Sequence, residues 1–452
     1  MRTILFIMLP FPSHYFVAFG TANYLKKEGY RVVFTGEEKV RTLIENEGFE
    51  FQKFQYITEY QKLDFKIWIA LLLKTILDKS YTKQRYKDFY SSILELNRLY
   101  KSLNPELILI DHHIGEYALF LNRYDSKIVI LNTKLSCYKS KGIPPLGIGW
   151  VSKNSFKDKI RAEFDWLVLK LKCYKKKSIE CLVFVGKSDS FFYKRWAKKY
   201  NIIWNDFFEE KSSTYTIIKH IPKLITYPHC IEYPFKDFFL DEWYIETPFQ
   251  KNESEYITVA YQEILEKILN KKENNLKIIY CALGTISFHE RKRADLLLLK
   301  IINAVKELPN VELILADDFL STQQSIKTTN IHIFKKVPQL HILQYCDLMI
   351  THGGLNSISE CIQAVVPILA FPLIKDIDHF GNSARVVANG FGLKGNIEKN
   401  SSDEIKMKIM EILNNIKYKE NIKLAGKRGE EKLSLHLFFK NILTKNGFAN
   451  QK

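Results

Sequence analysis

Polar side chains that could do chemistry follow directly after short apolar runs at several places in the sequence. After the apolar run 348–351 come His352, Gly353, Gly354, Asn356 and Ser357. Two glycines let a ligand approach the backbone closely, and the N–H groups at the start of a following helix attract an anion. This loop predicts a diphosphate site. The alternative is that Ser357 and Glu360 form an S-x-x-E capping box, which needs no ligand.

A second polar loop, residues 375–382, follows the next apolar run and carries Asp376, Asp378, His379 and Asn382. The carboxyl ends of parallel strands meet at one edge of a sheet, so this loop is expected beside the first one. Carboxylates are repelled by phosphate, and the hydroxyls of a sugar are their natural partners here. A metal ion is the competing ligand, but these residues give no firm ligand set, and we predict no metal site.

A candidate base lies near the start of the chain. His14 follows the first apolar run and precedes a helix expected over about 15–28, and Asp111 directly follows the apolar run 107–110. Both loops open on the same edge of a parallel sheet, so Asp111 can hold the imidazole of His14 in the tautomer that accepts a proton. The adjacent His112 and His113 are interpreted as spacer or acceptor-pocket residues.

The elements that position these loops alternate between β-type runs and helical patterns. This alternation predicts an α/β protein with two doubly wound, Rossmann-like domains, which suits a chain of 452 residues. We expect the first domain over 1–245, the second over 246–430, and a C-terminal helix within 431–452 that packs back on the first. Residues 221–249, rich in proline and aromatics, look like the connection between lobes, and the tail from about 403 to 450 reads as two helical stretches.

Composition narrows the partners and the compartment. The net charge of +17 is spread along the chain without a nucleic-acid-binding motif, so no nucleic-acid partner is expected. Seven cysteines without metal-ligand spacing indicate reduced thiols and a cytoplasmic location. The apolar segment 67–73 is too short to span a bilayer. Its flanking Lys66 and Lys74 leave open a peripheral contact with an anionic membrane, at its inner face, against the alternative that the segment packs onto its own domain.

Residues 336–386 resemble the donor-binding signature of the UDP-glycosyltransferase superfamily, whose members share the GT-B fold, in which two Rossmann-like domains face each other across a cleft. The matching positions, in order, are Pro338, Gln339, His352, Gly354, Asn356, Ser357, Glu360, Pro367, Pro372, Asp378 and Asn382. The segments 133–149 and 222–234 are similar, more weakly, to first-domain features of bacterial members such as zeaxanthin- and macrolide-type glycosyltransferases.

The resemblance implies a role for each matching residue. His352, Gly353, Gly354, Asn356 and Ser357 would hold the diphosphate, and Glu360 would bind the ribose hydroxyls. Val337 and Gln339 would edge the nucleobase, while Asp378 and His379 would contact the transferred sugar. Gly284 and Thr285 resemble a short element that touches the donor phosphates, although Gly-Thr also marks ordinary turns. His14 would be the catalytic base, oriented by Asp111.

Two departures from the signature affect the donor. Lys336 stands where the family often has an aromatic that stacks on uracil, and the usual Asp-Gln pair reads Asp378-His379, which resembles a galactose preference in related plant enzymes. The second loop is also two residues longer than the commonest form, so Asp376 competes with Asp378.

The sequence therefore predicts an inverting hexosyltransferase. It would move a hexose from a nucleotide sugar, UDP-glucose or UDP-galactose, to a hydroxyl of a small apolar or aromatic acceptor, with no cofactor and no metal. The alternatives are a nucleotide-sugar 2-epimerase on the same fold and a lipid glycosyltransferase working at a membrane surface.

Overall fold

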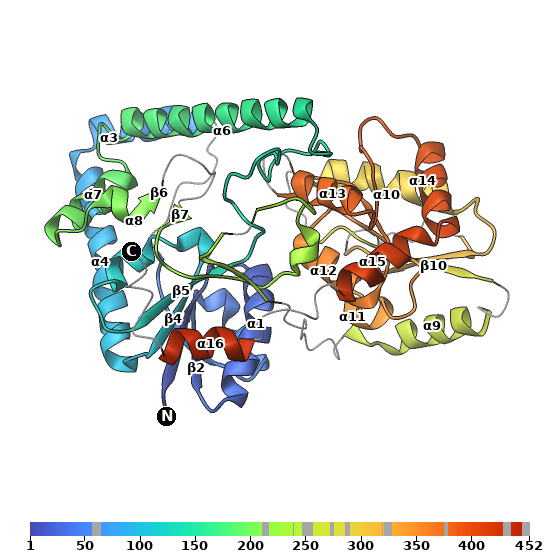
Figure 1. Cartoon of the computed structure of the whole chain (residues 1–452), viewed down its shortest axis with the longest axis horizontal. Helices are drawn as coiled ribbons and strands as arrows, with labels where there is room; N and C mark the ends of the chain where they lie inside the picture. The colour runs from blue at the N-terminus through green and yellow to red at the C-terminus, as the bar shows by residue number, and fades with distance from the viewer. Residues whose placement is uncertain are drawn as a thin grey trace.

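Two parallel sheets organise the chain (Figure 1). The computed structural model describes residues 1–56, 65–209, 217–237, 239–245, 256–271, 275–284, 290–318, 320, 328–374, 378–427 and 435–444. Thr285 and Asp376 lie outside the described residues, as do the predicted domain boundaries near 245/246 and 430/431.

The first sheet contains, in spatial order, β3 (Glu50–Lys53), β2 (Arg31–Gly36), β1 (Thr3–Ile7), β4 (Leu107–Asp111), β5 (Lys127–Asn132), β8 (Lys223–Ile225) and β9 (Glu242–Tyr244). Every neighbouring pair is parallel. The order reverses between β1 and β4, which is the point where doubly wound sheets bind ligands.

The second sheet has the same plan. Its spatial order is β12 (Ile331–Phe334), β11 (Val311–Ala316), β10 (Lys277–Ala282), β13 (Leu348–Thr351), β14 (Ile368–Ala370) and β15 (Gly392–Lys394). All neighbours are again parallel, and the order reverses between β10 and β13. A short antiparallel pair, β6 (Phe208–Glu209) and β7 (Ile217–Ile218), lies apart from both sheets.

Helices cover both faces of each sheet. Those up to residue 207 are α1 (Pro12–Lys27), α2 (Arg41–Asn46), α3 (Phe65–Leu77), α4 (Lys79–Leu103), α5 (Tyr117–Leu121), α6 (Phe156–Val183), α7 (Asp189–Lys199) and α8 (Trp204–Phe207), with 3-10 turns at Glu38–Val40 and His112–Ile114. A further 3-10 turn, His229–Ile231, lies between β8 and β9. The later ones are α9 (Val259–Lys271), α10 (Arg291–Val305), α11 (Gln339–Ile342), α12 (Leu355–Ala364), α13 (His379–Ala388), α14 (Ser402–Asn414), α15 (Lys417–Lys427) and α16 (Leu435–Thr444).

Alternating side chains along the central strands build the cores. In β1, Leu5 belongs to the core on one face of the sheet and Phe6 to the core on the other. In β10, Ile278 and Ile279 divide in the same way. A strand that is buried on both faces reads as a continuous apolar run, which is why these strands are visible in the sequence.

Three expectations about the elements need correction. Residues 221–249 are not simply a connection, because β8 and β9 within them are strands of the first sheet. Each has only three residues, too few to show an alternating pattern. Helix α1 begins at Pro12 rather than near Tyr15, because proline fits the first helical position, and this places His14 inside the first turn. The described part of the tail holds three helices, α14 to α16, rather than two.

The last helix returns to the first sheet. Phe438, Phe439 and Ile442 of α16 are buried in the core on one face of that sheet. Phe438 contacts the ring of Trp243, with the ring centroids 5.5 Å apart. Lys127 at the start of β5 donates to the carbonyl of Leu443 at 2.6 Å. Figure 1 shows α16 beside β2 and β4, far in sequence from both.

Candidate functional site

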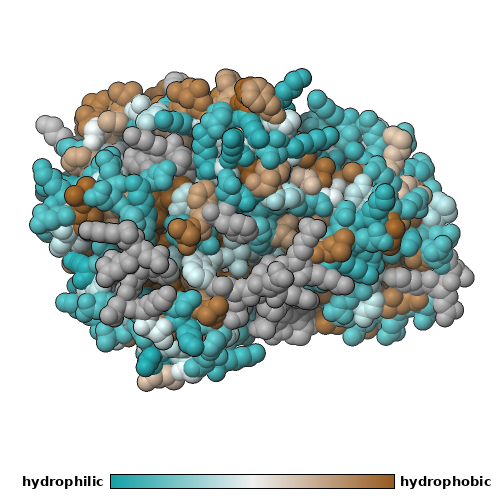
Figure 2. All heavy atoms as spheres, viewed as in Figure 1, coloured by the Kyte–Doolittle hydropathy of each residue, from teal (hydrophilic) through white to brown (hydrophobic). Residues whose placement is uncertain are grey.

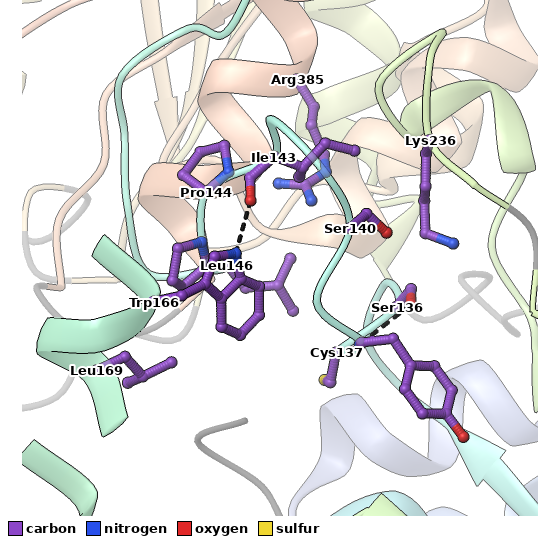
Figure 3. Close-up of a pocket in the computed structure, with 12 residues that line it drawn as sticks. Ser136, Cys137, Ser140, Ile143, Pro144, Leu146, Trp166, Leu169, Lys236 and Arg385 are labelled. Carbon is purple, nitrogen blue, oxygen red and sulfur yellow. Dashed lines mark hydrogen bonds between the residues drawn. The ribbon is translucent and has the colours of Figure 1, made fainter. Parts of the chain in front are cut away.

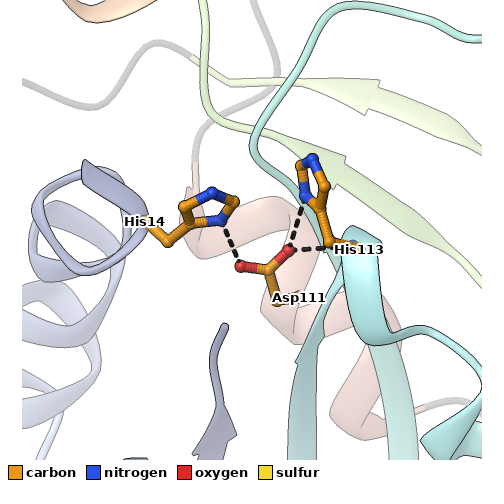
Figure 4. A group of neighbouring side chains, drawn as sticks. All are labelled: His14, Asp111 and His113. Atoms are coloured by element: carbon orange, nitrogen blue, oxygen red, sulfur yellow. Dashed lines mark hydrogen bonds and ion pairs between the residues drawn. The ribbon is translucent and has the colours of Figure 1, made fainter. Parts of the chain in front are cut away.

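The first half of the site is a buried carboxylate between two imidazoles (Figure 4). Asp111, at the end of β4, is fully buried, and its Oδ2 lies 2.6 Å from Nδ1 of His14. Its Oδ1 lies 3.1 Å from Nδ1 of His113. The rings of His14 and His113 meet edge to face, with centroids 4.7 Å apart.

The protonation of this group follows from the surroundings of Asp111. Burial alone would raise the pKa of its carboxyl, but His14, His113 and their hydrogen bonds outweigh burial and hold that pKa well below its usual range. Backbone N–H groups of Leu9 and His113 also donate to the carboxylate, at 3.3 and 2.9 Å. An ionised carboxylate only accepts hydrogen bonds, so each imidazole carries its proton on Nδ1. Nε2 of His14 is then the atom that can accept a proton.

Three neighbouring strands supply these groups. His14 comes from the first turn of α1, which follows β1. Asp111 ends β4 and His113 lies in the 3-10 turn after it, while Thr133 directly follows β5. The hydroxyl oxygen of Thr133 lies 3.3 Å from Nδ1 of both imidazoles. The sequence predicted that His14 and Asp111 would meet, but it gave Thr133 no role and left His113 as a spacer or pocket residue. The position directly after a β-run was the signal for Thr133.

The second half of the site is the turn from β13 into α12. The N-cap of α12 is Gly354, without a side-chain cap. The capping-box alternative is therefore wrong: Ser357 lies inside the helix, and Glu360 is buried. No side chain caps the first N–H groups of α12, so these backbone donors suit an anion.

Three glycines in and beside this turn are so closely packed that any larger residue would clash with its neighbours. Gly353 has φ +85°, and a Cβ there would lie 2.5 Å from Oγ of Ser383. Gly284, with φ +68°, and Gly354 both stand against the ring of His352, where a Cβ would come within 2.6 and 2.5 Å of ring atoms. Backbone and imidazole are thus packed into one small region.

Two histidines in this region have unsatisfied ring nitrogens. Nδ1 of His352 and Nδ1 of His379 are buried without a hydrogen-bond partner among the described residues. The two rings lie edge to face, 4.5 Å apart. Burial lowers the pKa of His352 to about 3, and burial also lowers the pKa of His379. Both rings are therefore neutral at ordinary pH and can offer N–H groups or lone pairs to a ligand.

The other residues predicted to bind the sugar donor include Gln339, Ser357 and Glu360, which form hydrogen bonds with one another. Nε2 of Gln339 donates to Glu360 and, at 3.3 Å, to Ser357. Val337 is buried just before the N-terminal end of α11. Glu360 is fully buried, and Gln339 already donates to one of its two carboxylate oxygens.

Direct contacts join the two halves. Lys134, after β5, places its Nζ 2.9 Å from Oδ1 of Asp378, and Tyr227 donates to Oδ1 of Asn356 at 2.8 Å. Burial would raise the pKa of Asp378, but Lys134 and His379 hold it well below its usual range. The sequence predicted Asn356 and Asp378 but not their partners, because Lys134 and Tyr227 come from loops more than a hundred residues away.

A buried ion pair strengthens the same junction. Nε of Arg385 on α13 lies 2.9 Å from Oε2 of Glu232, and both side chains are almost completely buried. Glu232 also accepts hydrogen bonds from the backbone of Ser136 and the hydroxyl of Tyr244, each at 3.0 Å. Asn389 donates to the carbonyls at residues 231 and 232.

A pocket opens beside this junction, under α6 (Figure 3). Its lining includes Cys137, Ile143, Leu146, Trp166 and Arg385. Nε1 of Trp166 donates to the carbonyl of Ile143 at 2.8 Å, which fixes the loop against the helix. Cys137 lies 3.6 Å from Nε2 of His112, the residue between Asp111 and His113. Cys137 thus belongs to the pocket wall and also contacts the residue next to Asp111 in sequence.

Comparisons with known proteins agree with this architecture. Residues 262–427 match the family model "UDP-glucoronosyl and UDP-glucosyl transferase". The uncharacterized UDP-glucosyltransferase YdhE of Bacillus subtilis is 29% identical over 161 residues, which cover 34% of this chain and 38% of that protein. The first curated relatives are matched over only 19 to 27% of their own length.

Solved structures extend the likeness to the whole chain. The glycotransferase of kitacinnamycin has a TM-score of 0.64 at 14% identity and covers 98% of both chains. The spinosyn rhamnosyltransferase SpnG complexed with thymidine diphosphate has a TM-score of 0.56 at 13% identity, covering 98% of this chain and 100% of that one. These neighbours confirm the predicted GT-B fold, and the family match confirms the predicted resemblance for the second domain. Residues 262–427 are therefore similar to the UDP-glycosyltransferase family, and they lie within a two-lobed GT-B fold.

Proposed function

We propose that this protein is an inverting glycosyltransferase that moves a hexose from a nucleoside diphosphate sugar to a hydroxyl of a small acceptor. The observation that carries the proposal is the 2.6 Å contact between His14 and Asp111, in the lobe opposite the one that carries the glycine-rich start of α12. The relatives and structures named above are transferases, so the epimerase alternative finds no support among them.

His14 would act as general base. With Nδ1 donating to Asp111, Nε2 takes the proton of the acceptor hydroxyl while the hydroxyl oxygen attacks the anomeric carbon. The new C–O bond forms on the side opposite the bond to the diphosphate, which breaks, so the configuration inverts. Asp111 stays ionised and stabilises the imidazolium that forms. A positioned base contributes about 10² to 10⁴ in rate.

The start of α12 would bind the departing diphosphate. Its N–H groups and the positive end of the helix dipole stabilise the negative charge that develops as the bond to the sugar breaks. His352 is neutral and adds a hydrogen bond rather than a charge, because its pKa of about 3 keeps it unprotonated. The SpnG complex supports a nucleoside diphosphate as the donor class. Within that class we propose UDP-glucose or UDP-galactose.

The proposed reaction needs no metal ion. Ligand atoms of His14, Asp111 and His113 lie within 4.8 Å of one another, which is close enough for all three to bind one divalent cation. Both oxygens of Asp111 already accept hydrogen bonds from the two imidazoles. A cation bound at this group would have to displace both ring protons and would remove the base.

The lining of the pocket under α6 supports an acceptor with an apolar part. Ile143, Leu146 and Trp166 give this small pocket apolar walls. A lipid acceptor is the alternative to a small one, and the exposed apolar surface of α6 described below favours the lipid.

The test is sugar transfer with UDP-glucose, UDP-galactose, UDP-N-acetylglucosamine and dTDP-glucose against a library of phenols, sterols and carotenoid alcohols. His14→Ala should lower kcat by about 10² or more, with donor binding retained in calorimetry. EDTA should leave the wild-type rate unchanged. Full activity in His14→Ala would contradict the mechanism, and loss of activity with EDTA would point to a metal-dependent reaction.

A further inference from the structure

Helix α6 carries an apolar stripe on its outer face. The side chains of Phe156, Ile160, Phe164, Leu167, Leu171, Tyr174 and Leu182 are between 44 and 77% exposed. From Phe156 to Tyr174 they recur every three or four residues, and Leu182 follows about two turns later, so all seven lie on one side of the helix. The residues that α6 buries, Ala162, Trp166 and Val183, lie on the opposite side. At 28 residues, the helix extends for about 42 Å.

Helix α3 widens this stripe. The two helices contact each other, and the ring of Trp68 meets that of Phe184 just after α6, with centroids 6.5 Å apart. On α3, exposed apolar side chains are those of Ile67, Ile69, Leu73, Ile76 and Leu77. Figure 1 shows α3 and α6 along the upper edge of the molecule, and Figure 2 shows hydrophobic side chains gathered along that edge. A contiguous exposed surface of this kind marks an interaction site.

Basic side chains flank the stripe on α6. At about 100° per residue, exposed Lys157 and Lys175 lie along one border of the stripe, and exposed Lys170 and Lys177 lie along the other. The acidic side chains of α6 are engaged elsewhere: Asp158 in the N-terminal cap, Glu163 with Lys139, Asp165 with Trp150 and Glu180 with Lys176. The surface is therefore apolar along its centre and positive along its borders.

We propose that the α3–α6 surface binds an anionic lipid bilayer. Exposed Phe and Leu on one face, with Lys along both borders, is the pattern of a helix that lies in the plane of a membrane interface. A second copy of this chain fits less well, because it would bring the lysines of both copies together and repel. Within the part of the chain that the structure describes, no helix is long and apolar enough to cross a bilayer. The contact is therefore peripheral.

The membrane contact goes beyond the proposed function. It places the outer face of α6 against the lipid. The inner face of α6 contributes Trp166 and Leu169 to the pocket beside the candidate site. The same helix thus presents its outer face to the bilayer and its inner face to that pocket.

The experiment is vesicle co-sedimentation with phosphatidylcholine vesicles, with and without phosphatidylglycerol. The wild type should bind the vesicles that contain phosphatidylglycerol, less so at high salt, because salt screens the lysines. Leu171→Glu should weaken binding about tenfold or more, since one leucine no longer enters the apolar layer. The matched control is Leu299→Glu on α10, because Leu299 is 50% and Leu171 58% exposed. The control should bind like the wild type.

Circular dichroism and thermal melting show whether each variant folds, and Lys170→Glu with Lys177→Glu tests the border charges independently of the apolar side chains. Vesicle binding needs no sugar donor, so its result does not depend on the proposed reaction. Absence of wild-type binding overturns the proposal. So does a dimer in sedimentation velocity that Leu171→Glu dissociates without affecting vesicle binding, because a second copy would then be the occupant.

Discussion

At the scale of single residues, the candidate base depends on one carboxylate that serves two imidazoles. Asp111 is fixed by backbone N–H groups from Leu9 and His113 as well as by the two side chains. Its orientation toward His14 therefore does not depend on the imidazole of His113 alone. The two histidines should differ in importance even though both contact the same carboxylate.

Replacing His113 by asparagine tests that difference. His113→Asn keeps the backbone N–H that donates to Asp111 and removes the imidazole, with its contacts to Asp111 at 3.1 Å and to Thr133 at 3.3 Å. We expect kcat to fall by about tenfold or less, the cost of one hydrogen bond, against about 10² or more for His14→Ala. Steady-state kinetics of the two variants with the same donor and acceptor check this. Equal losses in both would assign His113 a direct part in the proton transfer.

At the scale of elements, loops and helices from the two lobes hold the site together. The pair between Glu232 and Arg385 is the most deeply buried of these contacts, and the hydrogen bond from Tyr227 to Asn356 is another. Burial and neighbouring charges act on Glu232 in opposite directions, and the charges of Arg385 and Lys236 keep its pKa below the usual range. The pair is therefore fully ionised at neutral pH.

Breaking this buried pair should be costly. Arg385→Met leaves the carboxylate of Glu232 buried without its cation, and we expect a loss of about 3 to 5 kcal/mol in the free energy of unfolding. The double variant Arg385→Met with Glu232→Gln should recover part of that loss, because no isolated charge remains. Urea unfolding of the single and double variants measures both. A double variant as unstable as Arg385→Met would show that packing, not charge, sets the cost.

A glycine on α13 makes the junction unusually close. A Cβ on Gly381 would lie 2.0 Å from the carbonyl oxygen of Leu146, which is backbone and cannot turn away. Gly381→Ala should lower the free energy of unfolding by about 1 to 3 kcal/mol and weaken transfer by separating the lobes. The matched control is Gly426→Ala on α15, where a Cβ meets nothing within 4 Å. Thermal melts of the two variants decide, and equal melting temperatures would contradict the close approach.

The sequence predicted the features that apolar runs and strand ends determine. It missed the contacts that depend on how loops from the two lobes approach each other. Strand β13 was predicted to the residue, as the apolar run 348–351, because all four of its residues are buried. His14 and Asp111 were predicted to meet because strand ends share one edge of the sheet. The partners Lys134 and Tyr227 could not be predicted, since loop paths between lobes leave no periodic signal in the chain.

At the scale of the whole molecule, the folded state holds several histidines neutral. Burial lowers the pKa of His112 to about 3, as it does for His352, and burial also lowers the pKa of His113 and His379. In the unfolded chain these rings bind a proton below their ordinary pKa of about 6.5. Between about pH 6.5 and 3 the unfolded state therefore holds more protons, and acid favours unfolding.

The contribution of one ring can be isolated with His112→Gln. The stability that neutral His112 contributes is complete above about pH 6.5 and is lost as the pH falls toward about 3. The unfolding free energy of the wild type should consequently fall more steeply in that window than that of the variant, by up to about 1.4 kcal/mol per pH unit. Other titrating groups, among them Glu242 with its pKa raised by burial to about 7, are present in both proteins and cancel. Urea unfolding of both proteins at pH 5 and pH 7 measures this difference. An equal change in unfolding free energy between the two pH values in both proteins would contradict the prediction.

The return of α16 to the first sheet has a consequence for how the chain folds during synthesis. The ribosome releases the seven strands of that sheet long before Phe438 and Ile442 exist, and until then the apolar surface around Trp243 has no cover. The second lobe, by contrast, has all its strands by residue 394. Domains usually mature in the order of synthesis, but here the lobe that starts first is completed last. Nascent chains stalled before residue 435 should thus be the form that chaperones recognise.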